Sequence, residues 1–428
     1  KEYRRQRQMC IRDRPPNSMI CEICMGMPGV MPVANRRAIE LVIATGLALD
    51  CKIADETKFD RKNYPYPDLM KGYQISQYDK PVAINGHISI SDEGKEKIIG
   101  ITRVHLEEDV AKLFHRTEVS GESYSLLDVN RAGAPLMEIV GDPDLSSPDE
   151  ARQYLMNLRS IVQYLGVSTG NMEEGSFRCD ANISVRPVGS SELGAKVEVK
   201  NMNSFRSVYR ALEYEIDRQV HVIRDGGKIE QETRGWVEDR SITVSQRSKE
   251  YAHDYRYFPE PDLPPLTINR DWVEEIRSGL PELPEARHNR FMAQYGLSGY
   301  DSSLLTGAKE LADLFEEEVG QEPLEKTLLN RRAKAVSNWF LGKQTEMLNA
   351  SGPELADVTF ARLKKEKVVA PRGYAESFVA FRDRVFSGHI FIRHRCNHHG
   401  TQLPTEHPLL SLIHISEPTR LGMISYAV

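Results

Sequence analysis

The sequence predicts an α+β fold, in which a mixed or antiparallel sheet with interspersed helices forms one domain and an all-α domain follows. Three observations support this prediction. Residues from Ser176 to Arg186 alternate between apolar and polar, as expected for a strand with one buried face. Two amphipathic helices interrupt the strand-like segments without a strict strand–helix–strand rhythm. After about Trp272 the sequence patterns become helical.

The strand patterns are clearest between residues 176 and 201. Val197 and Val199 flank Glu198 in an alternating run that ends at Asn201. The preceding run has one apolar face and one polar face, which predicts a strand that covers a core on one side only. Its apolar residues are Phe177, Cys179, Ala181, Ile183 and Val185, and its polar residues are Arg178, Asp180, Asn182, Ser184 and Arg186.

Both helices of this domain have recognisable signals. Ser147, Pro148 and Glu150 form a capping box with proline at the first helical position, and Gly166 stands where a left-handed residue ends a helix. The second helix is expected from about Asn203 to Arg224, because its apolar residues recur with a period near 3.6.

The domain limits follow from composition. Residues 21–270 are expected to form the first, catalytic domain, and the prolines between residues 259 and 265 mark a linker. A helical domain is expected over 275–352. One helix is expected to begin at Leu283-Pro284, a second to include residues 309–319, and a third to run from 326 to 348.

The two ends look foreign to the rest of the chain. Residues 1–20 are rich in arginine and have no apolar period, so we expect a non-native leader, with an organelle transit peptide as the alternative. Residues 353–428 have no clear helical or strand period. They are left as an unassigned tail that we expect to be partly non-native.

Composition excludes several classes of protein. The chain has 428 residues, 40 % of them hydrophobic, and a formal net charge of −6. This charge excludes a histone-like basic binder, but not a nucleic-acid partner that meets a local basic face. No run approaches the ~18 apolar residues of a membrane helix. Six cysteines are too few for a disulfide scaffold, so a cytoplasmic location is expected, or an organelle if the leader is genuine.

The sequence contains no phosphate-binding loop, nucleophile elbow or HExxH motif. Glu138, however, interrupts the apolar run from Pro135 to Val140. A buried carboxylate must be paired, protonated or bound to a cation, because burying it unpaired is costly. The residues alone leave two equal interpretations, a metal ligand or a salt bridge to an arginine such as Arg131.

A second acidic group ends the strand-like run from Ile99. Alternation places Glu107 with His105 on one face and Glu108 on the other, so both glutamates cannot face one site unless the strand bulges. Mg²⁺ prefers oxygen ligands, commonly one or two carboxylates with waters and phosphates. The pattern therefore weakly predicts Mg²⁺-dependent phosphoryl transfer on a sheet, and a solvated charged face is the alternative.

Cys21 and Cys24 form a CxxC motif. A structural Zn²⁺ site needs two such pairs, so the motif is half of a zinc site or a pair of ordinary reduced thiols.

Long motifs follow one another along most of the chain. Through them the sequence resembles, over about residues 21–350, the B subunits of the bacterial tRNA-dependent amidotransferase, the GatCAB complex. The motifs are Cys21–Asn35, Lys58–Asp68, Gly72–Asp79, Ile101–Asp109, Asp128–Arg131, Met172–Asn182, Val199–Phe205, Gln231–Arg234 and Asp254–Asp262.

The resemblance implies a specific reaction. In this family the B subunit uses ATP and Mg²⁺ to phosphorylate the side-chain carboxylate of mischarged Glu-tRNA(Gln) or Asp-tRNA(Asn). Ammonia supplied by the A subunit then displaces the phosphate. The implied fold is a cradle domain like that of glutamine synthetase and guanido kinases, followed by a helical domain. The implied partners are the A and C subunits of a heterotrimer and the mischarged tRNA.

Site residues follow from the same resemblance. Glu108 and Glu138 match carboxylates of the family's Mg²⁺ site, and Lys62 matches a position near the ammonia path. No ATP-contacting residue is legible. From the polar strand faces we expect three further residues to orient phosphate or substrate, with structural salt bridges as the alternative: Arg178, Asp180 and Lys200.

Two family features are missing from this sequence. A Gly-Leu-Glu-x-His motif with further metal ligands precedes the CxxC motif in the family, and some members have a further cysteine pair that completes the zinc site. Their absence predicts poor Mg²⁺ binding and an incomplete Zn²⁺ site. The family's tRNA-contacting tail domain is not recognisable after about Gly352.

Two other interpretations remain. The related archaeal E subunit has a large inserted domain, for which there is no room between Asp262 and Trp272. A non-catalytic tRNA-binding or assembly subunit would tolerate the incomplete metal site. If tRNA binds the helical region, its phosphates are expected to meet basic residues there, with a solvated helix face as the alternative: Arg331, Arg332 and Lys334.

Overall fold

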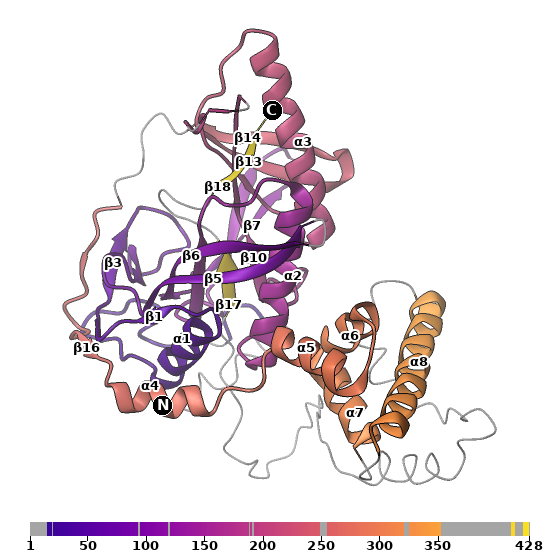
Figure 1. The fold of residues 1–428 in the computed structure, drawn as a ribbon. Helices are drawn as coiled ribbons and strands as arrows, with labels where there is room; N and C mark the ends of the chain where they lie inside the picture. The colour runs from indigo at the N-terminus through magenta and orange to yellow at the C-terminus, as the bar shows by residue number, and fades with distance from the viewer. Residues whose placement is uncertain are drawn as a thin grey trace. The chain divides into compact units, whose positions relative to one another are not determined.

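The chain combines antiparallel strand pairs with helices, which confirms the α+β class (Figure 1). It divides into two compact units between Pro281 and Glu282. Most of the expected leader and tail lies outside the described residues. The computed structural model describes residues 15–351, except 19, 93–94, 119, 188, 191, 249–254 and 321–324, together with the backbone of two strands at 412–415 and 423–427.

The largest sheet of the first unit has an antiparallel centre, where β6 pairs with β5 on one side and with β9 on the other. The β17 backbone lies parallel to both of its neighbours. In order the strands are β1 (Lys52–Ile53), β5 (Ala83–Asp92), β6 (Lys95–Glu108), β9 (Pro135–Gly141), β17 (Leu412–Ile415) and β10 (Phe177–Cys179).

Helices α1 (Arg36–Ala48) and α2 (Pro148–Tyr164) pack against this sheet and enclose the core of the unit. The signals of α2 are confirmed: the Ser147 side chain accepts from the Glu150 N–H, and Gly166 follows the helix with a φ of 65°. The sequence did not predict α1. Asn35 caps it, but its apolar residues are too numerous to show a clear stripe.

The second sheet is covered by α3 (Phe205–Arg224), which begins after the cap residue Ser204. The alternating run from Ser176 to Arg186 is broken at Asp180, so that its first part belongs to the large sheet and its second part to this one. A short 3-10 turn, η2 (Glu238–Arg240), joins two of the strands. In order these are β14 (Ile242–Ser248), β13 (Glu232–Val237), β12 (Val197–Lys200), β11 (Ala181–Arg186) and β18 (Met423–Ala427).

Two small sheets join segments that are far apart in sequence. Each sheet pairs a strand near the start of the unit with one near its end. In one of them the two segments are also joined by side chains, because the carboxylate of Glu260 accepts two hydrogen bonds from the Arg61 guanidinium, at 2.7 and 2.8 Å. The first contains β15 (Phe258–Pro259), β3 (Asp60–Asn63) and β4 (Tyr73–Ser76), and the second contains β16 (Leu266–Thr267) and β2 (Glu56–Thr57).

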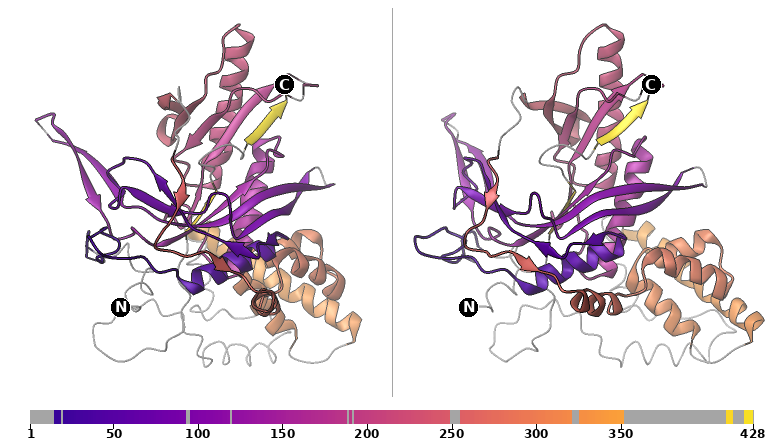
Figure 2. Two further views of the ribbon diagram at one scale, coloured as in Figure 1. Left: turned by 90° about the vertical axis from the view of Figure 1, so that its left-hand side faces the viewer. Right: turned by 60° about the vertical axis from the view of Figure 1, so that its left-hand side comes forward.

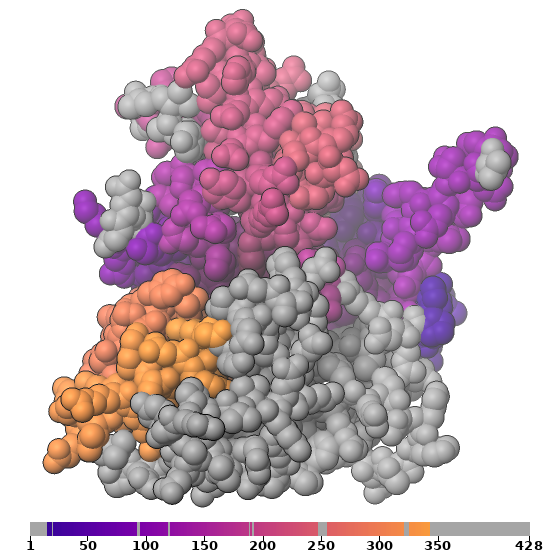
Figure 3. Space-filling model, turned by 90° about the vertical axis from the view of Figure 1, so that its right-hand side faces the viewer, coloured from indigo at the N-terminus to yellow at the C-terminus, as the bar shows by residue number. Residues whose placement is uncertain are grey.

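A hairpin of β7 (Lys112–Thr117) and β8 (Ser123–Asp128) projects from the first unit (Figures 2 and 3). Residues 15–18 lie against its base, where Asn17 donates to the Leu127 carbonyl and accepts from the Val129 N–H. Helix α4 (Arg270–Ser278) also belongs to the first unit, and the domain boundary expected between residues 270 and 275 falls within this helix.

The second unit is helical in its described part. Phe291, Tyr295 and Phe315 form its aromatic centre, with ring centroids 5.0–5.4 Å apart. No helix among the described residues is both long and apolar enough to cross a membrane. The helices are α5 (Pro284–Tyr295), α6 (Gly299–Thr306), which the sequence did not predict, α7 (Lys309–Val319) and α8 (Lys326–Ser351).

Candidate active site

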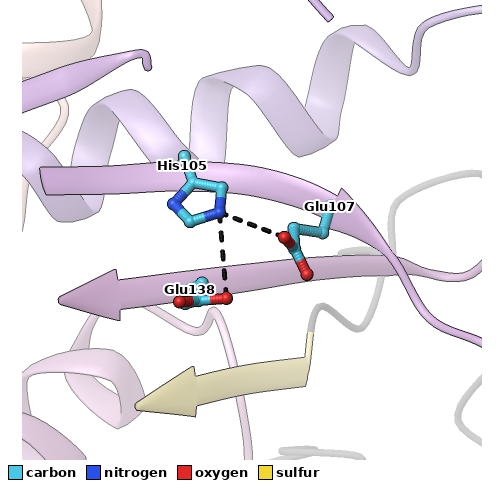
Figure 4. A group of neighbouring side chains, drawn as sticks. All are labelled: His105, Glu107 and Glu138. Atoms are coloured by element: carbon cyan, nitrogen blue, oxygen red, sulfur yellow. Dashed lines mark hydrogen bonds and ion pairs between the residues drawn. The ribbon is translucent and has the colours of Figure 1, made fainter. Parts of the chain in front are cut away.

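Three buried side chains meet on two neighbouring strands of the large sheet. His105 and Glu107 extend from β6, and Glu138 extends from β9 directly opposite His105 (Figure 4). The His105 Nε2 atom lies 3.2 Å from Glu107 Oε1 and 3.8 Å from Glu138 Oε2. Each residue is at most 5 % exposed. Two carboxylates and an imidazole therefore lie close together in the interior of the unit.

The pleat of the sheet explains this arrangement. Val104 and Leu106 alternate with the cluster residues on β6, and Met137 and Ile139 flank Glu138 on β9. These four apolar side chains belong to the hydrophobic core that contains α1. The polar side chains consequently point to the opposite face of the sheet.

Strand β4 supplies hydrogen bonds to the cluster. Ser76 Oγ donates to Glu107 Oε1 at 2.5 Å, and Gln74 Nε2 donates to Glu107 Oε2 at 3.1 Å. Both oxygens of the Glu107 carboxylate thus have partners, which compensates for the loss of water. Glu107 is held in place by protein contacts alone.

The two carboxylates titrate differently. Burial by itself raises the pKa of Glu107, but the charge of Lys62 and the contact with His105 outweigh it and hold that pKa below its ordinary range. The Lys62 Nζ atom is 3.8 Å from Glu107 Oε1. Burial and the neighbouring negative charge of Glu107 raise the pKa of Glu138 well above its ordinary value. Burial lowers the pKa of His105, so its imidazole is neutral at pH 7.

The cluster has the properties of a divalent cation site. Glu138 Oε1 and His105 Nδ1 are buried and have no hydrogen-bond partner. One ligand atom from each of the three residues lies within 4.8 Å of the others, and no other group of His, Cys, Asp or Glu in the described part of the chain does so. Two carboxylates suit a hard cation such as Mg²⁺, and a neutral imidazole is a further donor. The residues present therefore fit the expected metal ion.

Three residues predicted from the sequence lie at or beside this cluster. Lys62 pairs with Glu107, as described above. Lys200 Nζ donates to Asp180 Oδ2 at 2.7 Å and lies 3.2 Å from Glu198 Oε1. The Asp180 charge also contributes to the raised pKa of Glu138, which places this pair next to the cluster.

Glu108 is not brought together with Glu138. Its carboxylate accepts from Lys71 Nζ at 2.6 Å and from the Ile75 N–H at 2.9 Å. The reason is the two-residue period of a strand: Glu107 is two residues from His105 and shares its face, whereas Glu108 does not. The structure therefore places Glu107, not Glu108, with Glu138.

Arg178 also lies in a different environment from the one expected. Its guanidinium donates to Asp109 Oδ2 at 2.9 Å, and Arg131 lies 3.4 Å from the same oxygen. Asp109 is buried, so these two arginines balance its charge. This geometry favours the salt-bridge alternative for Arg178.

Replacing Arg178 by Gln should lower the free energy of unfolding by about 1–3 kcal/mol, because the buried Asp109 carboxylate loses one of its two charged partners. Urea unfolding would measure this loss. Arg152→Gln, which changes an exposed arginine, should alter stability by less than about 0.5 kcal/mol. An unchanged stability in Arg178→Gln together with a weaker response to Mg²⁺ would instead assign Arg178 to the site.

The sulfur atoms of Cys21 and Cys24 are 3.3 Å apart. The other described cysteines, Cys51 and Cys179, are buried, and burial raises the pKa of the Cys51 thiol to about 12. No second CxxC pair exists in the described part of the chain, so half a zinc site stays a prediction.

The fold and the site define the class: an α+β catalytic domain with a buried cluster of carboxylates, imidazole and lysines. Residues 4–274 match the family model described as the GatB/GatE catalytic domain, and the chain belongs to this family. The resemblance read from the sequence motifs is thereby confirmed. The matched range begins inside residues 1–20, for which a non-native leader stays a prediction.

Bacterial relatives support the same assignment. The chain is 60 % identical over 349 residues to a protein of Dehalococcoides mccartyi strain CBDB1, covering 82 % of this chain and 70 % of the relative. It is 55 % identical over 342 residues to one of Carboxydothermus hydrogenoformans (80 % and 69 %). It is 50 % identical over 376 residues to one of Caldanaerobacter subterraneus subsp. tengcongensis (88 % and 74 %). All three are named as the B subunit of an aspartyl/glutamyl-tRNA(Asn/Gln) amidotransferase.

Proposed function

We propose that this chain is the subunit of a tRNA-dependent amidotransferase that activates the misacylated amino acid. It would phosphorylate the side-chain carboxylate of Glu-tRNA(Gln) or Asp-tRNA(Asn) with ATP and Mg²⁺, and the product would be amidated to Gln-tRNA(Gln) or Asn-tRNA(Asn). The names of the relatives support the reaction, and the buried cluster of His105, Glu107 and Glu138 supports the cation-dependent step.

The proposed reaction has two balanced steps. A carboxylate oxygen of the substrate attacks the γ-phosphorus of ATP, the bond to the β–γ bridging oxygen breaks, and ADP leaves. Ammonia then attacks the carbonyl carbon of the acyl phosphate, the C–O bond breaks, and inorganic phosphate leaves while the nitrogen loses one proton. Since an unactivated carboxylate is a poor acyl donor, the first step makes the second possible.

The residues of the cluster have distinct roles in this proposal. Glu107, Glu138 and His105 would hold the cation, which supplies charge neutralisation for the transferred phosphoryl group. Lys62 keeps Glu107 ionised and adds a positive charge on the side of the site formed by β3. Catalysis of this kind depends mainly on positioning and charge, which a rigid buried cluster provides.

The finer features of the family belong to the same proposal. They are a cradle like that of glutamine synthetase and guanido kinases, a following helical domain, A and C subunits as partners with ammonia from the A subunit, and a cytoplasmic location. The word subunit in the relatives' names supports an assembly.

The experiment that tests the proposal measures ADP release by the full chain reconstituted with amidotransferase A and C subunits. With ATP and Mg²⁺ present, release should require Glu-tRNA(Gln) or Asp-tRNA(Asn) and stop when EDTA is added. The correctly charged Gln-tRNA(Gln) is the matched control and should give only background release. Binding of the mischarged tRNA without any release of ADP would refute catalysis and leave the tRNA-binding or assembly role.

Two of the three expected tRNA contacts, Arg331 and Lys334, are exposed on the helical unit. Lys334 forms an ion pair with Asp301, and Arg332 donates to the Glu318 carbonyl at 2.8 Å. Arg331 is exposed on α8.

Replacing Arg331 by Gln should reduce the slope of log affinity for tRNA against log salt concentration by about 1, because one phosphate contact is lost. An unchanged slope in a filter-binding titration would exclude this contact.

A further inference from the structure

Arg103 lies on the same face of β6 as the buried cluster. It precedes His105 by two residues and Glu107 by four, so the period of the strand points all three side chains the same way. On the adjacent strand Arg103 is opposite Val140, which places it diagonally across from Glu138. Such diagonal neighbours are about 7–8 Å apart at their backbone positions, within reach of a long side chain.

Two other cations border this site, and each has a carboxylate partner. Lys62 lies 3.8 Å from Glu107, and Lys200 donates to Asp180 at 2.7 Å. Arg103 differs from both, because it forms no hydrogen bond or ion pair with any residue that the structure describes. Its Nε atom is buried and has no acceptor.

A buried guanidinium N–H without an acceptor, on the same strand face as buried carboxylates, requires a physical explanation. A buried N–H without a partner costs free energy, and guanidinium groups are matched by anions that accept two parallel hydrogen bonds. The nearby carboxylates already have partners or belong to the cation cluster. An anion that enters the site from outside the chain would supply the missing acceptor.

The anion must also tolerate a divalent cation next to it. Arg103 and a cation held by His105, Glu107 and Glu138 would repel each other across the same face unless an anion with several charged oxygens lay between them. A phosphate group has this property, since some of its oxygens can meet the cation while others accept from the guanidinium. A phosphate group fits this position better than a single carboxylate, because it carries more oxygens and more negative charge.

We infer that Arg103 binds the terminal phosphate of a nucleoside triphosphate, in a subsite of β6 next to the His105–Glu107–Glu138 cluster. This inference rests on the proposed function and adds to it a residue that contacts ATP. The planar fork of Arg103 then orients the γ-phosphate toward the cation cluster. Arg103 also compensates for the charge that spreads over the phosphate oxygens during transfer.

The test compares binding of Mg·ATP and of inorganic triphosphate to the full chain by equilibrium dialysis. Arg103→Gln should weaken both ligands by about 10- to 100-fold, because charge-assisted hydrogen bonds from the guanidinium are lost. Arg103→Lys should lose less, because it keeps the charge but not the fork. Arg152→Gln, an exposed arginine on α2, is the matched control and should bind like the wild type.

Two further measurements separate the possible outcomes. Mg²⁺ alone should raise the melting temperature of Arg103→Gln at least as much as that of the wild type, because the variant lacks the positive charge that repels the cation, and this increase would show that the variant folds and keeps the cation cluster. Equal affinity of wild type, Arg103→Gln and Arg103→Lys for inorganic triphosphate would overturn the inference and leave the proposed function intact. A wild-type chain that binds neither triphosphate nor Mg·ATP would overturn both.

Discussion

Replacing Glu138 by Gln should abolish the response of the protein to Mg²⁺ and reduce ADP release at least about a hundredfold. The amide has nearly the same shape as the carboxylate but cannot provide a negatively charged oxygen to a cation, and loss of such a ligand weakens metal binding strongly. Binding of mischarged tRNA should persist, because Glu138 is 1 % exposed and cannot reach an RNA surface. Thermal shift with Mg²⁺ and ADP release would measure the two effects.

The same substitution should make the metal-free protein more stable at pH 8. In the wild type, burial and the neighbouring charge of Glu107 oppose ionisation of Glu138, and Gln carries no charge to oppose. A matched control is Glu150→Gln, which changes a buried carboxylate paired with Lys97 at 2.8 Å, outside the cluster. This control should be less stable but keep the full Mg²⁺ response. A Mg²⁺ response in Glu138→Gln equal to that of wild type would remove Glu138 from the metal site.

The affinity for Mg²⁺ should fall steeply as the pH is lowered from 8 toward 5.5. Because the pKa of Glu138 is raised, the metal-free site holds a proton that the cation must displace, and the dissociation constant should rise about tenfold per pH unit below that pKa. Above pH 6.5, the ordinary pKa of a histidine, His105 should not contribute to this pH dependence, since burial lowers its pKa. Isothermal titration with Mg²⁺ at several pH values would measure the slope.

The stability of the metal-free protein should change with pH in the opposite direction to the Mg²⁺ affinity, and fall as the pH rises. Glu138 binds its proton more tightly in the folded than in the unfolded chain, so its contribution to stability is complete below the ordinary value of 4.5 and is lost as pH rises through the raised pKa. Saturating Mg²⁺ should reverse this decline, and Glu138→Gln should remove it. Urea unfolding at several pH values would measure this decline. If the unfolding free energy falls with pH equally in the wild type and in Glu138→Gln, the raised pKa does not belong to Glu138.

The sequence predicted the elements whose signals are local. The cap at Ser147 and the stop at Gly166 identify α2 because a few neighbouring residues determine both ends. Helix α1 was missed because it is apolar on most sides. The division of residues 176–186 between two sheets was also missed, because strand pairing depends on residues far away in sequence.

The site was predictable to a similar degree. Glu138 is conspicuous because a carboxylate in an apolar strand must be compensated, and this reasoning needs no knowledge of the neighbouring strands. Glu107 shares a face with His105 by alternation, but only the register of β6 and β9 shows that this face is the one that Glu138 enters. The unsatisfied state of Arg103 depends on every neighbour, so no sequence pattern could show it.

The closure of the first unit by β15 and β16 has a consequence for its synthesis. Arg61 and Glu260, which join the two ends of this unit, are separated by 199 residues. Contacts of such long range slow folding, since a large loop must be closed before they form. A nascent chain therefore carries Lys62, His105 and Glu138 out of the ribosome long before the segment that completes their surroundings. During that interval its unpaired strands are exposed, so the ribosome-bound intermediate is expected to need the protection of chaperones.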